Sequence, residues 1–375
     1  MLTQGVRTVY INLPTGVFAL AIMAYSLKLN PTNSVTFKQF CATFDFAGLF
    51  FILAGVILLL LGFNSGETSW SDKTTIVELV LGVVLLLVAA YVEITTKRSA
   101  IIPPRLFRTR TTACILIAVY CQSWGFITMS YYGPLYFQIL GSSSIMSGIR
   151  MFPFSLGSSV VSIMTGFIIS RTKKYRAIII ASYFFSAVGY ALIASLDDRS
   201  SVAQQEIYLL VAGFGCGSLF QAPYIALQAA MPVADMPAST STVGLIRSIG
   251  GTTGIAIGGS IFASLLKRRL PAIAGYAPKT ANLTSDVTGL AQIMPLEVRD
   301  QVLHAYTKSI NAIWFLGAPL SFIGFILCLF LKHYALDQRE VVRTAKPVDK
   351  GGNDQGEERV ALEGVEAKEE TEGRV

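Results

Sequence analysis

Charged side chains are scarce in this sequence and make up only 14% of its 375 residues. A soluble globular domain usually carries about 25% charged residues. Hydrophobic residues account for 53% of the chain. The shortage of charge therefore excludes an ordinary soluble domain and directs attention to long apolar stretches.

Histidine and paired cysteine are also scarce. The only histidines are His304 and His333, so a histidine-based metal site is not expected. The five cysteines form no close CxxC pair, and we interpret them as small apolar packing residues without disulfides or metal. We find no Ser/His/Asp set, no paired catalytic carboxylates and no phosphate loop, so neither an enzyme nor a cofactor is predicted.

What the sequence has in abundance is apolar runs long enough to cross a bilayer. A transmembrane helix needs about 20 predominantly apolar residues. The fold class that this pattern predicts is all-α membrane, a polytopic bundle of about nine transmembrane helices embedded in a lipid bilayer. The predicted spans are 9–28, 43–63, 75–96, 112–138, 147–170, 176–196, 206–230, 240–265 and 310–332.

Basic residues gather in alternate turns between these spans. The turn 97–111 carries five basic residues and no acid, and 171–176 carries four and no acid, whereas 64–74 and 197–205 are acidic or mixed. Positively charged loops stay cytoplasmic. The pattern predicts an integral membrane protein with the N-terminus outside and the C-terminal tail in the cytoplasm. Because the basic residues are scattered between spans, we do not expect nucleic-acid binding.

Two regions lie outside the spans. Residues 266–309 form a long predicted external loop, and its Asn282-Leu283-Thr284 pattern is a candidate N-glycosylation site that agrees with an external location. Residues 336–375 are rich in Gly, Glu and Lys, and Asp349–Val375 carries a net charge of −5. We expect a disordered cytoplasmic tail, because such a composition buries too little apolar surface to fold.

Ionisable side chains inside a bilayer are costly and are functional candidates by default. Asp45, Glu78 and Glu93 lie within a few residues of a membrane face and are expected to reach the interface. Arg150 opens the span 147–170 from outside. Arg247 lies about seven residues into its span, so both an interfacial role and a functional role remain open for it.

Glycines recur every four residues in the span 240–265, at Gly250, Gly254 and Gly258. Small residues at this spacing let two helix backbones approach closely in lipid. Close helix packing is the expected role, and a smooth face that permits helices to slide against one another is the alternative.

Polar side chains mark candidate cavity positions in two spans. Gln221, Tyr224 and Gln228 fall on one helical face, and Gln122 and Trp124 lie at mid-depth of the span 112–138. They suit either a substrate cavity or hydrogen bonds between helices. Prolines interrupt several spans, a feature tolerated where neighbouring helices or water satisfy the freed carbonyls. These prolines are Pro134, Pro153 and Pro223.

Five local motifs recur along the chain in a characteristic order and spacing. They are Tyr10-Ile11-Asn12-Leu13-Pro14 with Gly16, Pro104-Arg105-Leu106-Phe107, Tyr131-Tyr132-Gly133-Pro134-Leu135-Tyr136-Phe137-Gln138, Ser147-Gly148-Ile149-Arg150-Met151-Phe152-Pro153 and Arg247-Ser248-Ile249-Gly250-Gly251. Together they resemble the fungal fourteen-span drug:proton antiporter branch of the major facilitator superfamily, which includes toxin and multidrug efflux pumps. This chain departs from the family pattern at Gly133, usually bulky and apolar, and at Phe152, usually Leu.

The resemblance implies a domain organisation. Its first motif opens the family's sixth span, so the nine spans correspond to spans six to fourteen. The family's first five spans, with their acidic coupling position, membrane arginine and antiporter motif, have no counterpart here. The implied parts are the last helix of the N-terminal bundle (1–29), two linker helices (30–110), a C-terminal six-helix bundle with the external loop (111–335) and the tail (336–375).

The function implied by the resemblance is proton-coupled efflux of amphipathic small molecules such as drugs, toxins or secondary metabolites. The partners would be such a substrate, protons and lipid. The plasma membrane is the expected location and the vacuolar membrane the alternative. Because transporters of this kind work between two halves, we expect the active form to be longer. The alternative is a non-transporting half-bundle or degenerate paralogue that assembles with another membrane protein.

Overall fold

A computed structural model describes residues 12–26, 36–96, 98, 100–107, 109–231, 235–274, 276, 290 and 293–332 of the chain. Its regular structure over these residues is helical. The shorter helices are α2 (Asn12–Ser26), α3 (Phe37–Thr43), η1 (Pro104–Phe107), α7 (Ser144–Arg150), α11 (Ala222–Ala230) and η3 (Leu270–Ala272). The longer helices are α4 (Phe46–Gly66), α5 (Lys73–Thr95), α6 (Arg110–Ile139), α8 (Phe152–Thr172), α9 (Tyr175–Ala194), α10 (Val202–Ser218), α12 (Met236–Arg269) and α13 (Leu296–Leu329).

Eight helical spans in the described residues are long and apolar enough to cross a membrane. The all-α membrane fold predicted from the sequence is therefore confirmed. The first predicted span, 9–28, is represented by α2, whose flanking residues lie outside the described part of the chain. The candidate glycosylation residue Asn282 and the tail 336–375 lie outside it as well.

Helices α12 and α13 extend further than the predicted spans 240–265 and 310–332. Much of the segment 266–309, expected to be a loop, is therefore helical. The physical reason lies in the first turns of α13, where Val302, Tyr306 and Ile310 are almost completely buried. Their spacing of four residues makes an apolar stripe on an otherwise polar helix, which hydropathy alone does not detect.

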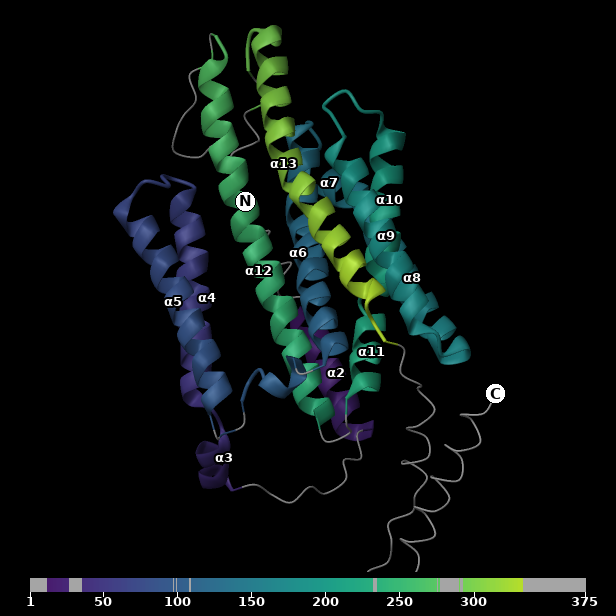
Figure 1. Ribbon diagram of the computed structural model, residues 1–375. Coiled ribbons are helices and arrows are strands. Elements are labelled where there is room, and N and C mark those ends of the chain that lie inside the picture. Colours follow the sequence, from purple (N-terminus) through teal and green to yellow (C-terminus); the bar gives the residue numbers. More distant parts are fainter. Residues whose placement is uncertain are drawn as a thin grey trace, which may run out of the picture.

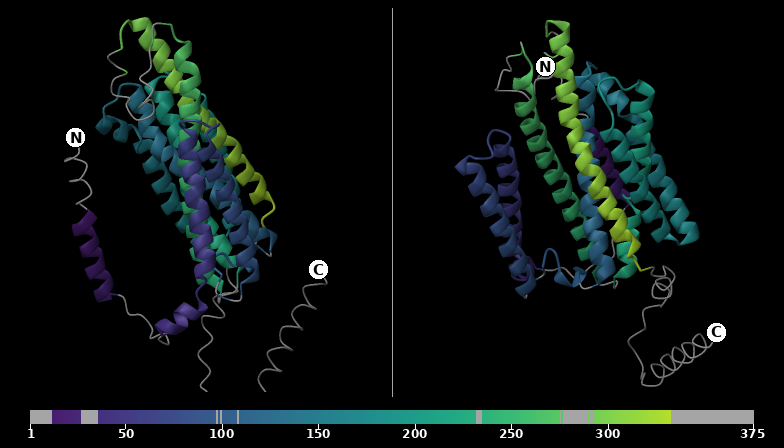
Figure 2. Two further views of the ribbon diagram at one scale, coloured as in Figure 1. Left: turned by 90° about the vertical axis from the view of Figure 1, so that its left-hand side faces the viewer. Right: turned by 45° about the horizontal axis from the view of Figure 1, so that its top comes forward.

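Helices α4 and α5 form a hairpin that lies beside the rest of the molecule and packs on α12 (Figure 1). Helix α2 lies apart from the other helices in the left view of Figure 2. The side chains of its residues 13–26 are all exposed. The structure thus consists of one helical bundle, one hairpin and one separate apolar helix.

Helices α6 to α13 form the bundle, with α6 packed against both α12 and α13 (Figure 1). Its core contains large aromatic side chains, among them Trp124, Tyr190 and Trp314, each no more than 2% exposed. Buried aromatic rings of this size contribute much of the packing energy of such a core.

The two basic turns predicted to share one side of the membrane do lie at the same end of the molecule. The connection after α5 and the turn between α8 and α9 are both at the lower end in Figure 1. The turns between α4 and α5 and between α9 and α10 are at the upper end, as the charge pattern predicted.

Candidate substrate path at a broken helix

The span 202–230 is not continuous. Helix α10 ends at Ser218, residues 219–221 form a turn, and α11 begins at Ala222. Pro223, in the first turn of α11, explains the break, because proline has no N–H to donate to the carbonyl four residues earlier. The carbonyl of Leu219 is thereby freed inside a membrane-spanning segment and needs another donor.

Arg247 supplies that donor. Its Nη2 atom donates a hydrogen bond to the Leu219 carbonyl oxygen at 3.3 Å. The guanidinium also lies over two aromatic rings, 4.9 Å from the centroid of Phe220 and 5.2 Å from that of Tyr224. A cation over an aromatic face within about 6 Å is stabilised, and more so where water is excluded.

Helix α6 fixes the backbone at the same place, because Ser123 Oγ donates a hydrogen bond of 2.6 Å to the carbonyl oxygen of Arg247. No ion pair between Arg247 and an acidic side chain occurs in the described residues, and its Nε atom is buried without a partner there. Arg247 is thus a half-buried cation held by two aromatic rings and one carbonyl oxygen, and a functional role for it stays a prediction.

The predicted stripe of Gln221, Tyr224 and Gln228 is interrupted by the break. Gln221 belongs to the turn and is exposed, whereas Tyr224 and Gln228 are half-buried on α11. The amide oxygen of Gln221 lies 2.8 Å from the point that a Cβ on Gly166 of α8 would occupy. Tyr224 therefore belongs to the Arg247 cluster, and Gln221 borders it across the turn.

Gln122 and Trp124 lie inside the bundle on α6, and each is 2% exposed. Trp124 packs against Gly254 and Gly317, which makes it a core residue. Both amide atoms of Gln122 are buried without a hydrogen-bond partner among the described residues. A buried unpaired amide is costly, and its neighbour Ser123 contacts the Arg247 backbone, so Gln122 remains the stronger candidate of the two.

The glycine face of α12 lies against α6. A Cβ on Gly250 would come within 2.7 Å of the Tyr120 carbonyl oxygen, and one on Gly258 within 2.9 Å of the Tyr132 ring. Gly254 lies directly against Thr128. The contacts are those of close backbone packing, the first of the two roles expected for this face.

Arg150 does not join Arg247. It ends α7, toward the opposite end of the bundle (Figure 1), and its guanidinium lies 5.5 Å from the centroid of the Phe137 ring. The two arginines are therefore separate features, one at a helix junction and one at the broken span.

The prediction that Asp45 and Glu93 extend to the interface is wrong. Asp45 is 2% exposed and Glu93 is 5% exposed. Asp45 caps α4 by accepting a hydrogen bond from Gly48 N, and Glu93 accepts from two backbone N–H groups. Side chains that satisfy helix ends and turns turn inward. Glu78, by contrast, is half-buried and accepts a hydrogen bond of 2.8 Å from Ser65 Oγ.

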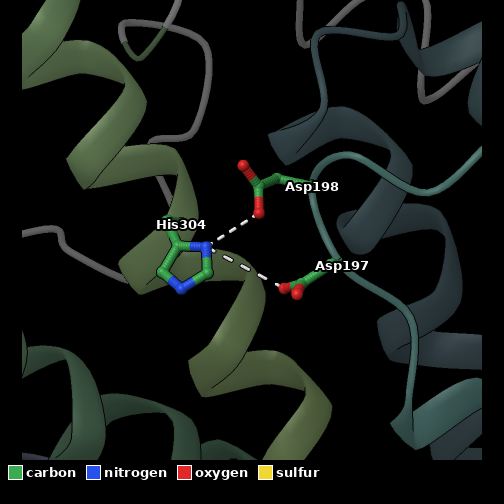
Figure 3. Close-up of side chains that lie close together, drawn as sticks. All are labelled: Asp197, Asp198 and His304. Atoms are coloured by element: carbon green, nitrogen blue, oxygen red, sulfur yellow. Dashed lines mark hydrogen bonds and ion pairs between the residues drawn. The ribbon is translucent and has the colours of Figure 1, made fainter.

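Asp197, Asp198 and His304 converge at the upper end of the molecule, an arrangement that the sequence analysis did not anticipate (Figure 3). His304 Nδ1 is 2.8 Å from Asp198 Oδ1 and 3.9 Å from Asp197 Oδ1. The three ligand atoms lie within 4.8 Å of one another, a spacing compatible with a metal ion. The Lys308 ammonium, 3.1 Å from Asp197, already places a positive charge there. We therefore interpret the group as an ion-pair network that links the turn after α9 to α13.

Three cavities lie away from the broken span, and none of them is lined by Arg247 or by the predicted cavity residues. One of about 520 Å³ lies between the end of α6 and the start of α13. One of about 550 Å³ lies between α9 and α13 and is mostly apolar. The third, of about 430 Å³, lies between the hairpin and the bundle and includes Glu93. Among the residues that the structure describes, the Arg247 cluster therefore lines none of these three cavities.

Comparison with known proteins identifies the family of this chain. The Major Facilitator Superfamily matches residues 7–255, which includes α2, the hairpin and the broken span. The chain belongs to this superfamily. The uncharacterized MFS-type transporter C1399.02 of Schizosaccharomyces pombe is 33% identical over 350 residues, 92% of this chain and 58% of its own length.

Two relatives carry names that state an activity. The efflux pump dotC of Dothistroma septosporum is 31% identical over 86% of this chain and 56% of its own length. The efflux pump FUS6 of Gibberella fujikuroi is 27% identical over 87% of this chain and 61% of its own length. The chain therefore spans about three fifths of the curated relatives it matches. The names of these relatives describe transporters and efflux pumps.

Proposed function

We propose that this chain forms the linker hairpin and C-terminal bundle of an efflux transporter that exports amphipathic small molecules in exchange for protons. The efflux pumps among its relatives support export, and the eight apolar spans support a membrane location. The plasma membrane is the proposed location, with the N-terminus outside and the tail in the cytoplasm. The substrate would pass between this bundle and a second, N-terminal bundle, as in transporters built from two halves.

The main support for the proposal is the broken span and its contact with Arg247. Discontinuous helices whose freed backbone groups take part in binding are typical of transporter sites. Here the break frees the Leu219 carbonyl, and the arginine that takes it also lies on the faces of Phe220 and Tyr224. An aromatic and cationic group of this kind suits aromatic amphipathic substrates, which could stack on the same rings.

The test is dye accumulation in yeast cells that lack their own efflux pumps. Cells would express the full chain alone, or together with the part of dotC that lies outside the matched region. We expect rhodamine 6G accumulation to fall several-fold when both are present, and Arg247→Ala to abolish the effect. Unchanged accumulation with both proteins in the membrane would contradict the proposal.

Arg171→Ala is the matched control. Arg171 also lies over an aromatic ring, 5.0 Å from the centroid of Phe167, but it is exposed in the last turn of α8. Its replacement should leave dye export unchanged. A loss of export in Arg171→Ala equal to that in Arg247→Ala would mean that general arginine loss, and not the broken span, is responsible.

The second candidate function is a half-bundle that assembles with another membrane protein without transporting. The observation that favours it is α2, whose side chains at 13–26 are exposed and which lies apart from the bundle in Figure 2. Affinity purification of the tagged chain from its native membrane distinguishes the two. A stoichiometric membrane partner in cells that show no dye export supports assembly, and a chain that exports dye without such a partner excludes it.

A further inference from the structure

The cavity between the hairpin and the bundle contains one charged group. It measures about 430 Å³ and is lined by residues of α4, α5, α12 and the connection that joins α5 to α6. All of its described lining residues except Glu93 are hydrophobic. A mostly apolar pocket of this size with one polar group suits a small organic ligand. The lining residues are Ile52, Leu86, Ala89, Ala90, Glu93, Ile94, Ile102, Pro104, Phe107 and Ile249.

Backbone N–H groups hold the Glu93 side chain in place. Glu93 lies in the last turn of α5 and is 5% exposed. Its Oε1 atom accepts a hydrogen bond from Ile101 N at 3.1 Å, and its Oε2 atom accepts one from Ile102 N at 3.2 Å. Hydrogen bonds donated to both oxygens favour the carboxylate form of such a group. The cavity therefore has a fixed negative group in its wall.

Among the residues that the structure describes, no basic side chain is paired with this carboxylate. The two arginines on the connection after α5 bind elsewhere. Arg98 donates to the Phe44 carbonyl oxygen at 3.4 Å, and Arg105 pairs with Asp235 at 2.8 Å. A carboxylate in apolar surroundings is costly unless a positive charge balances it. The complementary occupant of the cavity is therefore a cation with hydrophobic surface.

The hydrophobic wall extends along the helices away from Glu93. On α5 it begins at Leu86, seven residues before Glu93, which is about 10 Å along the axis at about 1.5 Å per residue. Ile52, on the facing helix α4, lines the same cavity and is 5% exposed. The arrangement matches a ligand with a positive group at one end and an apolar body over the adjoining two helical turns.

We propose that this cavity binds an amphipathic organic cation, with its positive group against Glu93 and its apolar body against the hairpin. The site differs from the broken span, where Arg247 itself supplies a positive charge. An uncharged occupant would remove water from Glu93 without balancing its charge, which is why the observations favour a cation. The site stands on its own contacts and does not depend on the proposed efflux.

Equilibrium dialysis of radiolabelled tetraphenylphosphonium against the purified full chain in maltoside micelles tests the role of the charge. We expect saturable binding to the wild type and at least about tenfold weaker binding to Glu93→Gln, because one partner of a buried charge pair is removed. The glutamine keeps an oxygen that can accept from one of the two backbone N–H groups, so the connection after α5 should remain in place.

Glu78→Gln is the matched control for this change. Glu78 lies on the same helix, is half-buried and accepts a hydrogen bond from Ser65, but it does not line the cavity. Its replacement should leave the affinity for tetraphenylphosphonium unchanged. Equal affinities of the wild type and Glu93→Gln would overturn the proposal, and so would equal losses in Glu93→Gln and Glu78→Gln.

Ala90→Trp tests the location of the site without changing its charge. Ala90 is exposed and lines the cavity, so an indole there would occupy space that the ligand needs. Binding should weaken by at least about tenfold. Ala191→Trp adds the same side chain at an exposed position in the separate cavity between α9 and α13, and it should bind as the wild type does. Wild-type affinity in Ala90→Trp would show that the ligand binds elsewhere.

Two other occupants are distinguished by the same assay. Tetraphenylborate has nearly the same shape with the opposite charge, and if it binds as tightly as tetraphenylphosphonium, hydrophobicity alone decides and the proposal fails. If phosphatidylcholine added to the micelles abolishes binding, the cavity is a lipid site and the proposal also fails. Selective binding of the cation in the presence of the lipid supports it. Dye export plays no part in these readouts, so failure of the proposed transport would leave the result unaffected.

Discussion

At the scale of single residues, glycine decides how closely helices approach. A Cβ on Gly250 would lie 2.7 Å from the Tyr120 carbonyl oxygen and 3.3 Å from Ser123 Cβ. A backbone oxygen cannot move aside as the end of a flexible side chain can, so α12 would have to shift away from α6. The spacing of these glycines was visible in the sequence, but the helix that they contact was not.

Gly250→Ala should therefore lower the free energy of unfolding by about 1–3 kcal/mol, the usual cost of overpacking. Thermal unfolding in detergent measures the change. Gly244→Ala on the same helix is the control, because a Cβ there meets nothing within 4 Å. It should be neutral or stabilising by up to about 1 kcal/mol through helix propensity. Equal losses in the two variants would contradict the packing role.

Glu67 gives a pH dependence at the opposite end of the hairpin. Burial raises the pKa of this carboxyl above 4.5, and the nearby Lys267 ammonium partly offsets the rise. The folded state then binds a proton more tightly than the unfolded chain does. Stability should decline as the pH rises from about the unfolded value of 4.5 through the raised folded value.

Glu67→Gln should remove that part of the decline and leave the protein more stable than the wild type above this range. Melting temperatures of both proteins between acidic and neutral pH provide the measurement. Glu297→Gln, a change at an exposed carboxyl at the start of α13, serves as the control and should follow the wild-type curve. A Glu67→Gln curve parallel to the wild type at every pH would show that burial of Glu67 has no such effect.

At the scale of elements, the hairpin packs through glycines. Glycines of α4 contact leucines of α5, and a glycine of α5 contacts a leucine of α4. A Cβ on Gly55 would lie 2.9 Å from Leu86, one on Gly62 would lie 2.7 Å from Leu79, and one on Gly82 would lie 2.9 Å from Leu59. Both helices use the pattern, which brings their backbones together in the way that small residues do in lipid.

A double-mutant cycle on Gly62 and Leu79 tests this pattern. Gly62→Ala alone should cost about 1–3 kcal/mol of stability. Combined with Leu79→Ala it should cost less than the sum of the single changes, by about 0.5–3 kcal/mol, because the shortened side chain makes room. Gly62→Ala combined with Leu53→Ala, a change at an exposed residue of α4, should be additive. Additivity in both combinations would exclude the glycine–leucine contact as a source of stability.

The sequence predicted the elements well where hydropathy decides them and poorly where side-chain contacts decide them. Apolar runs located eight spans, and charge located the turns that share an end. The buried stripe of Val302, Tyr306 and Ile310 was missed because polar residues surround it. Asp45 and Glu93 were placed at the interface because a one-dimensional pattern does not show that they cap a helix end and a turn. Arg247 stood out in the sequence as an arginine within a span, but its bond to a carbonyl freed by Pro223 could be seen only in the fold.

At the scale of the whole molecule, the shared location of the basic turns supports an orientation with that end in the cytoplasm. Asn282 tests the orientation independently. We expect the protein from a eukaryotic host to shift to lower mass on deglycosylation, and Asn282→Gln to remove the shift. Cytoplasmic accessibility of a tag inserted beside Asn282 in intact, selectively permeabilised cells would contradict the orientation.

We propose that this chain supplies one half of a proton-driven export path through the broken span. The most direct measurement is rhodamine 6G uptake into inside-out membrane vesicles that contain the full chain together with the unmatched part of dotC. We expect uptake that is driven by an acidic vesicle interior. This uptake should be lost on addition of a protonophore and in Arg247→Ala, but not in Arg171→Ala. Uptake equal to that of vesicles lacking the chain, with both proteins present in the membrane, would contradict it.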